Sequence, residues 1–296
     1  MGNIALTGNS KKVEFNPRNY DDLIKLTESV RKQVDLKEVP TIGIICGSGL
    51  GGIGGHIKDA QTLPFKQIVG FPTTSVIGHK GNLVFGYLGG KYVVCLQGRC
   101  HPYEHGMDLA LCAMPVRLMH QLGVETLIVS NAAGSANPKF NYGELMIIKD
   151  HIFMPGLAGF SPLVGVNDPR FGARFVSLND AYDRQLRQLA QTVAKDLNIV
   201  LHEGVYVMSG GPQYETPAEV VFYKTVGVDA LGMSTCHEVT VARQCGIKVL
   251  GFSLICNICN TDAEKSVDVS HEEVLKAAKF SGDNACSFVI EFISRL

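Results

Sequence analysis

Short apolar runs rich in β-branched residues alternate along the chain with longer amphipathic stretches, and this alternation limits the fold more than any other feature. Runs of this length and composition are typical of buried strands. Strands and helices that alternate without a break in composition indicate one α/β domain, which we expect to span residues 1–296. The predicted strands lie at residues 42–46, 92–96, 126–130, 145–148, 205–208 and 248–255.

Helical periodicity fills the intervals between these runs. Pro115 is expected to start or kink one of the helices, and about residues 1–12 are expected to form a disordered leader. The connections 47–82 and 150–179 are long for an α/β protein, and loops of that length are commonly functional. The clearest helical stripe consists of Leu186, Leu189, Ala190, Val193 and Leu197. Further helices are predicted near 20–36, 108–122 and 271–295.

Composition excludes several classes of protein. Only 19% of the 296 residues are charged and the formal net charge is −1, which argues against an extended nucleic-acid or membrane-surface footprint. No apolar run approaches the ~20 residues of a membrane span. The nine cysteines are an odd number and widely spread, which favours reduced thiols in a cytoplasmic protein over a disulfide scaffold. Cys256 and Cys259 form the only close pair, and a zinc ribbon would need a second one.

A glycine-rich segment follows the first predicted strand. Residues 47–52 read Gly-Ser-Gly-Leu-Gly-Gly and match the G-x-G-x-x-G pattern of dinucleotide sites. Such a site needs an acidic residue about 20 positions later to hold the ribose, but residues 60–103 contain neither Asp nor Glu. The pattern therefore favours an oxyanion site built from backbone N–H groups and the Ser48 hydroxyl. The alternative is a plain turn between strand and helix.

A second anion-binding candidate follows the strand predicted at 92–96. Arg99 carries a planar fork suited to phosphate or carboxylate. His101 lies two residues later, on the same side of an extended chain, and Pro102 keeps the segment out of a helix. The alternative is a surface turn with solvated charges.

Candidate groups for a planar ring lie in the second half of the chain. Thr216 and Glu219 form a capping box, which places Glu215 just before a helix N-terminus where a carboxylate is favoured. Asn257 ends an apolar run, and strand ends are where ligands bind in α/β proteins. A second capping box at 270–273 places His271 in the first turn of a helix. Simple capping and an Asx turn are the structural alternatives.

Taken together, these residues resemble the trimeric (low-molecular-mass) purine nucleoside phosphorylase family. The matching blocks run in the family's order and spacing over roughly residues 20–295. They are residues 45–51, 98–104, 130–134, 211–215, 232–235, and Asn257 followed by 271–274.

The resemblance implies a phosphorylase/hydrolase-like fold, with a mixed central β-sheet flanked by helices. It also implies phosphorolysis of nucleosides, with inorganic phosphate as co-substrate and no metal or cofactor. By similarity, phosphate is held by Ser48, His79, Arg99, His101, the Ala132 N–H and Ser234. The ribose is faced by Tyr103, Met233 and His271, and by Phe171 from a neighbouring subunit of a homotrimer. The base is framed by Tyr214, Glu215, Leu231, Met233 and Asn257, and the catalytic residues are Asn257, Glu215 and His101.

Departures from the family pattern gather around the base. They are Tyr214 for Phe, Leu231 for Val, Cys256 for Thr, Ile258 for Lys, and Cys236-His237 for Val-Pro. We expect 6-oxopurine nucleosides (inosine, guanosine) as substrates. Because of these departures, we also expect a widened or shifted base tolerance. The alternatives are a methylthioadenosine phosphorylase, a nucleoside hydrolase, and a catalytically silent nucleoside- or phosphate-binding protein.

Overall fold

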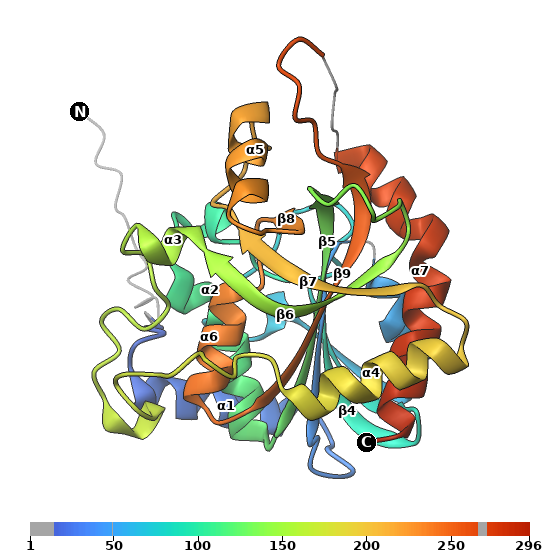
Figure 1. Ribbon diagram of the computed structural model, residues 1–296. Helices are drawn as coiled ribbons and strands as arrows, with labels where there is room; N and C mark the ends of the chain where they lie inside the picture. The colour runs from blue at the N-terminus through green and yellow to red at the C-terminus, as the bar shows by residue number, and fades with distance from the viewer. Residues whose placement is uncertain (1–14, 49, 266–270) are drawn as a thin grey trace, which may run out of the picture.

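Nine strands form one mixed sheet in the computed structural model, which describes residues 15–48, 50–265 and 271–296 (Figure 1). In the last helix, residues 271, 273–275 and 277–281 are described by their backbone alone. The order across the sheet is β2-β3-β4-β1-β5-β8-β7-β6-β9. The strands are β1 Ile42–Cys46, β2 Lys58–Pro64, β3 Asn82–Leu88, β4 Lys91–Gln97, β5 Thr126–Ser135, β6 Leu145–Phe153, β7 Leu201–Met208, β8 Ala230–Gly232 and β9 Lys248–Ile258.

The long strand β5 joins the two parts of the sheet. β1 runs parallel to β4 and β5, and β5 runs parallel to β9. Gly134 and Ser135, at the end of β5, pair with β8. Since β8, β7, β6 and β9 are paired in turn, the strands from β5 to β9 close into a ring. The carboxyl ends of the parallel strands β1, β4, β5 and β9 therefore lie at one edge, the usual place for a ligand in such a sheet.

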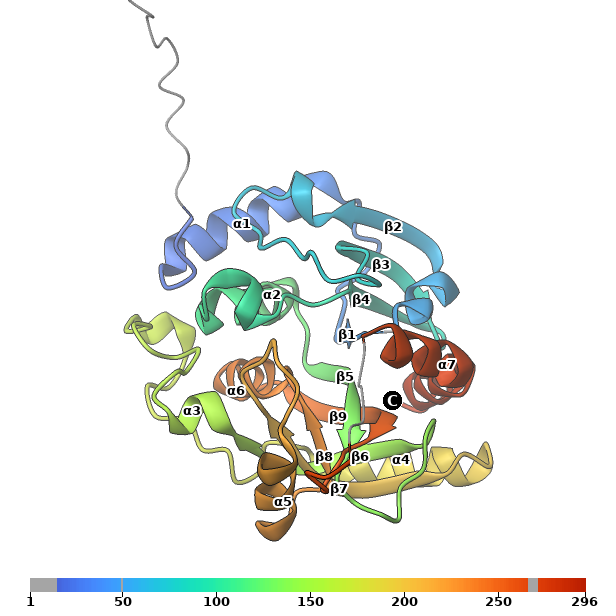
Figure 2. The same cartoon turned by 90° about the horizontal axis from the view of Figure 1, so that it is seen from above.

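Helices cover both faces of the sheet, as Figure 2 shows from above. The first face carries α1, α2 and α6, and the second carries α4 and α7. The helices are α1 Tyr20–Gln33, α2 Leu109–Leu122, α3 Met154–Leu157, α4 Arg184–Asp196, α5 Pro217–Thr225, α6 Cys236–Gln244 and α7 His271–Ser294. In the described ranges, no helix is long and apolar enough to cross a membrane.

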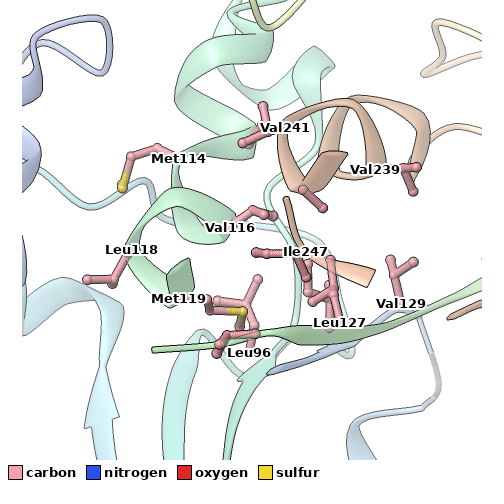
Figure 3. Close-up of a cluster of buried hydrophobic side chains, with 14 of the residues drawn as sticks. Leu96, Met114, Val116, Leu118, Met119, Leu127, Val129, Val239, Val241 and Ile247 are labelled. Carbon is pink, nitrogen blue, oxygen red and sulfur yellow. The ribbon is translucent and has the colours of Figure 1, made fainter. Parts of the chain in front are cut away.

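Alternate side chains of β5 enter two separate cores. Leu127 and Val129 belong to the cluster with α1, α2 and α6, whereas Ile128 packs with α4 and α7. Figure 3 shows Leu127 and Val129 in the first cluster, among side chains of α2 and α6 such as Met119 and Val239. Each such side chain stabilises the fold by about 1.5–3 kcal/mol when it is fully buried. Burial on both faces explains the unbroken apolar runs of the central strands.

The predicted strands and helices are all present, and the mixed sheet with flanking helices is confirmed. β1 has the predicted bounds, while the other strands extend beyond their apolar runs. Pro115 lies inside α2, so the expectation that it starts the helix is wrong, and Asp108 caps that helix instead. The predicted connection 47–82 contains β2, and β3 and β8 were also missed. The leader at 1–12 lies outside the described residues.

A glycine after β1 is required by close packing. A Cβ on Gly47 would lie 2.6 Å from the Ser130 carbonyl oxygen and 2.8 Å from Nη1 of Arg99. Both neighbours are buried, so neither can move away freely. We therefore expect Gly47→Ala to lower the free energy of unfolding by about 1–3 kcal/mol, as overpacking does. Urea denaturation measures this change.

Gly55 provides the matched control, because a Cβ there would meet nothing within 4 Å. Gly55→Ala should change the stability by no more than about 1 kcal/mol in either direction. Equal stability of the two variants would contradict the packing argument.

Candidate active site

One cavity of about 440 Å³ opens at the carboxyl ends of β1, β4, β5 and β9. That volume lies within the range of small-molecule sites. Segments from both halves of the sheet contribute to its wall, so residues far apart in sequence meet there. The predicted site residues that line it are Ser48, Arg99, His101, Tyr103, Ala132, Tyr214, Glu215, Leu231, Met233, Ser234 and Asn257.

Arg99 is anchored by a carboxylate that the sequence analysis did not identify. Its Nε and Nη2 donate to the two oxygens of Glu238 at 3.1 and 2.7 Å, and Nη1 donates to the Ser130 carbonyl at 2.7 Å. Both side chains of the pair are nearly inaccessible, with 1% and 2% exposure. Burial opposes ionisation of Glu238, but the adjacent guanidinium holds the pKa of its carboxyl below the usual range. The bidentate face of the Arg99 guanidinium is therefore taken up by Glu238. The N–H groups that remain on Arg99 are the ones available to a ligand in the cavity.

Three aromatic rings are stacked beside Arg99, and two of them, His101 and Tyr103, line the cavity. His79 lies 5.2 Å from His101 and His101 lies 4.9 Å from Tyr103, measured between ring centroids. His79 does not line the cavity, but its Nε2 lies 3.1 Å from the Ser48 hydroxyl oxygen. Burial, with the neighbouring His101, lowers the pKa of His79 to about 4, and burial also lowers the pKa of His101. Both imidazoles are therefore neutral near pH 7.

Glu104 fixes the orientation of His101. Its Oε2 accepts from the His101 backbone N–H at 2.9 Å and lies 3.3 Å from Nδ1 of the same residue. Its Oε1 accepts from the backbone N–H and the hydroxyl of Ser75. Burial opposes ionisation of this carboxyl, but the hydrogen bonds from His101 and Ser75 hold its pKa well below the usual range. This carboxylate joins two wall segments, because Ser75 and His101 both line the cavity.

The start of α6 supplies further polar groups. Ser234 lies two residues before the first residue of α6, and its Oγ lies 3.3 Å from the hydroxyl of the N-cap residue Thr235. Thr235 accepts from the side-chain amide of Asn131 at 2.9 Å. Thr235 also has a φ of 84°, a costly conformation for a β-branched residue. Such strain is found mostly at functional sites.

The segment before α5 and the end of β9 supply the other polar groups of the cavity. The predicted capping box of Thr216 and Glu219 is confirmed, and it places Glu215 before α5. Oε1 of Glu215 accepts from the Ser209 hydroxyl at 2.7 Å, which leaves the second oxygen for a ligand. The side chains of Asn257 and Cys259 lie against the backbone of residue 134. They can do so because this residue is glycine: a Cβ there would lie 2.6 Å from the Cys259 sulfur. A carboxylate and a carboxamide thus line the same cavity.

Among the predicted residues with described side chains, Phe171 does not line the cavity, as is also true of His79. Phe171 is only 5% exposed, and its ring lies beneath the Arg117 guanidinium at 4.5 Å and 5.1 Å from Tyr20. The prediction that Phe171 reaches a neighbouring subunit is therefore wrong, because the side chain is packed in its own core. His271 begins α7, but its side chain and Ser270 of the predicted second capping box lie outside the described residues.

Several residues of the wall, and Glu238 behind Arg99, were missed by the sequence analysis. Ser75 comes from the long connection 47–82, whose length was the only signal. Asn131 and Gly134 lie inside a matching block but were given no role. Glu238 could have been found from charge, because a buried arginine requires a partner. In the described part of the chain, no group of three or more His, Cys, Asp or Glu could hold a metal ion.

Comparisons with known proteins place this arrangement in a family. A family model described as "Phosphorylase superfamily" matches residues 41–294. The purine nucleoside phosphorylase of Mus musculus is 50% identical over 252 residues, which cover 84% of this chain and 87% of the relative. This chain belongs to the purine nucleoside phosphorylase family. The resemblance stated from the sequence blocks is thereby confirmed.

Solved structures of the family have the same fold. A Schistosoma mansoni purine nucleoside phosphorylase in complex with inosine is 44% identical, with a TM-score of 0.90 over 96% of this chain and 99% of that chain. Isoform 2 from the same organism, in complex with cytosine and ribose-1-phosphate, is 43% identical, with a TM-score of 0.89 over 95% of this chain and 99% of that chain.

The buried ion pair between Arg99 and Glu238 gives a stability prediction. Glu238→Gln leaves the buried Arg99 guanidinium without a charged partner, so the free energy of unfolding should fall by about 3–5 kcal/mol. Denaturant unfolding measures the change. Glu203→Gln is the control, because Glu203 pairs with Arg187 at 2.9 Å near the surface and such pairs contribute about 0–1 kcal/mol. The argument fails if both variants lose the same stability.

Proposed function

We propose that this enzyme cleaves the N-glycosidic bond of purine ribo- and deoxyribonucleosides with inorganic phosphate. The products are the free base and ribose or deoxyribose 1-phosphate, and inosine and guanosine are the main substrates. One observation carries the proposal. A single cavity holds an anion-binding group of residues (Ser48, Arg99, His101) at one end and a carboxylate with a carboxamide (Glu215, Asn257) at the other.

The first end suits phosphate. The Ser48 hydroxyl, the free N–H groups of Arg99, the Ala132 backbone N–H and Ser234 supply donors, as anion sites require. His79 supports the site through its contact with Ser48. His101 is neutral and its Nδ1 faces Glu104. A proton on Nδ1 leaves Nε2 as an acceptor for the P–OH group of hydrogen phosphate.

The second end suits a 6-oxopurine. Glu215 has one carboxylate oxygen for the N1–H donor of the ring, and Asn257 can both donate and accept at the N7/O6 edge. The Tyr214 ring offers a face for stacking, and Leu231 and Met233 complete the wall. Tyr103, Met233 and His271 are proposed to face the ribose between the two ends.

Positioning and charge stabilisation account for the reaction. A phosphate oxygen attacks C1′ while the bond from C1′ to N9 breaks, and the electron pair of that bond passes into the purine. Positive charge develops on the sugar, as in other glycosyl transfers. Phosphate supplies the nucleophile and a nearby negative charge, so the protein needs no nucleophilic carboxylate. Asn257 donates to the N7 edge and stabilises the negative charge that develops on the departing base, and Glu215 holds the ring in place through its N1–H. Neither a metal nor an organic cofactor is needed.

We further propose that the enzyme is a homotrimer, that it lies in the cytoplasm, and that it acts in purine salvage. Exposed apolar side chains gather in the connection after β6, where Leu157 is 76%, Phe160 51% and Phe175 90% exposed. Large exposed apolar side chains in one connection are what a subunit interface would cover. All nine cysteines are free thiols, as a reducing compartment favours.

Product analysis with inosine tests the proposed reaction. Hypoxanthine and ribose 1-phosphate should form only when phosphate is added. Free ribose formed without phosphate would indicate a hydrolase instead, and binding of hypoxanthine without turnover would indicate a silent binding protein. Faster cleavage of methylthioadenosine than of inosine would indicate a methylthioadenosine phosphorylase. Rates with guanosine, adenosine and cytidine then rank the bases, and negligible turnover of inosine would refute the 6-oxopurine preference.

Asn257→Ala tests the role of the carboxamide. Loss of one group that stabilises developing charge should lower kcat/KM for inosine by about 10²–10³-fold. Asn284→Ala is the control, because Asn284 is exposed on α7 away from the cavity wall. Steady-state assays with saturating phosphate measure both variants. A loss below about threefold at Asn257 would remove this residue from the mechanism.

A further inference from the structure

A hydrogen bond behind the cavity wall holds the Glu215 carboxylate. Ser209 is the first residue after β7, and its hydroxyl donates to Oε1 of Glu215 at 2.7 Å. In the described part of the chain, no other hydrogen bond reaches this carboxylate. Ser209 itself is not among the residues that line the cavity. Its effect on a ligand is therefore exerted through Glu215.

The sheet fixes the position of the Ser209 hydroxyl. The Ser209 backbone N–H donates to the Gly232 carbonyl oxygen at 2.8 Å, which continues the pairing of Met208 with Gly232 between β7 and β8. The hydroxyl has one hydrogen, and the Gly232 oxygen lies 3.3 Å from Oγ, farther away than Oε1 of Glu215. Because the shorter contact is also the one to a charged acceptor, the hydrogen is donated to Glu215.

The bond gives the two oxygens of Glu215 different roles. Oε1 is taken by Ser209, and Oε2 remains for a donor in the cavity. Each carboxylate oxygen has few lone pairs, and an oxygen that already accepts a short bond is a weaker acceptor for a second donor. Glu215 therefore offers the base one strong acceptor instead of two.

Purine bases differ in the number of donors that they present to such a carboxylate. This step rests on the proposed function, in which Glu215 accepts from N1–H. Hypoxanthine has a C2–H beside its N1–H, and this group needs no acceptor. Guanine has a 2-amino group there, and its two parallel donors are matched best by a carboxylate that offers both oxygens. In this site, the oxygen that would complete the match is already bonded to Ser209.

We propose that Ser209 determines specificity by positioning Glu215, and that its hydrogen bond makes the enzyme favour inosine over guanosine. Both nucleosides remain substrates, since they carry the same ribose and react with the same phosphate. The 2-amino group is disfavoured because it loses its hydrogen bonds to water on binding and gains only a weakened acceptor.

Rates on two substrates test the proposal on the unaltered enzyme. Inosine and guanosine are assayed with saturating phosphate. We expect kcat/KM for inosine to exceed that for guanosine by about fivefold or more, the size expected for one incomplete hydrogen bond. Equal values, or a preference for guanosine, would overturn the proposal.

A substitution at Ser209 assigns the preference to this residue. Ser209→Ala frees Oε1 of Glu215, so the ratio of kcat/KM for guanosine to kcat/KM for inosine should rise by about fivefold. General damage to the structure would lower both values and leave their ratio unchanged. The ratio therefore separates positioning of Glu215 from an effect on folding.

Ser135→Ala is the matched control. Ser135 also lies at the end of a strand of this sheet, but its hydroxyl donates to the Asn137 carbonyl oxygen at 2.9 Å. The ratio should stay unchanged in this variant. A ratio that changes by the same factor in both variants, or in neither, would overturn the proposal.

Turnover of inosine in the same assays reports separately on the proposed function. If inosine is not cleaved, the proposed reaction is refuted, and calorimetry with inosine and guanosine tests the role of Ser209 instead. Inosine should then bind about fivefold more tightly than guanosine, and Ser209→Ala should remove the difference. Equal affinities in the unaltered protein, or binding of neither nucleoside, would overturn the proposal.

Discussion

The buried ion pair between Arg99 and Glu238 is the interaction on which the site depends. It connects the segment after β4 to the first turn of α6, and the bond from Arg99 to the Ser130 carbonyl connects both to β5. Three elements far apart in sequence are thus held at one point of the sheet edge. Two charges are costly to remove from water, and the cost is offset only when their geometry is good and their hydrogen bonds are satisfied. The pair therefore defines where an anion can lie rather than providing a large net stability.

The two ends of the cavity are built on different principles. At the Arg99 end, a fixed guanidinium, stacked rings and the Glu104 carboxylate leave little room for movement, and Gly47 is required by contact with both Arg99 and β5. At the Glu215 end, the wall comes from the start of α5 and the last residues of β9, where Tyr214 is 41% exposed. At the first end, charge and fixed geometry determine what can bind. At the second end, the shape of the wall matters more. Under the proposed function, a rigid anion site thus lies next to a more open base site.

The parts of this picture that were predictable from the sequence share a physical origin. Strands buried on both faces, such as β1, produce unbroken apolar runs and were found. The strand β2 was missed because most of its side chains are exposed or half-exposed, and β8 was missed because three residues carry no periodicity. Most of the site residues named from the blocks meet in one cavity, because glycine turns and strand ends have local signals. Phe171 was misplaced because an aromatic residue in a loop gives no sign of whether it points into its own core or away from it.

Contacts between residues far apart in sequence explain what the sequence analysis missed at the site. The partner of Arg99 lies 139 residues away, and no local pattern connects the two. Physical reasoning could still have demanded a carboxylate, because a guanidinium that follows a buried strand cannot be left uncompensated. The same reasoning applies at Glu215, whose bond to Ser209 leaves a single oxygen for the ligand. At both positions, the contact inside the protein determines which atoms remain to face the substrate. The chemistry of this site is therefore set by the hydrogen bonds made behind its wall as much as by the residues on it.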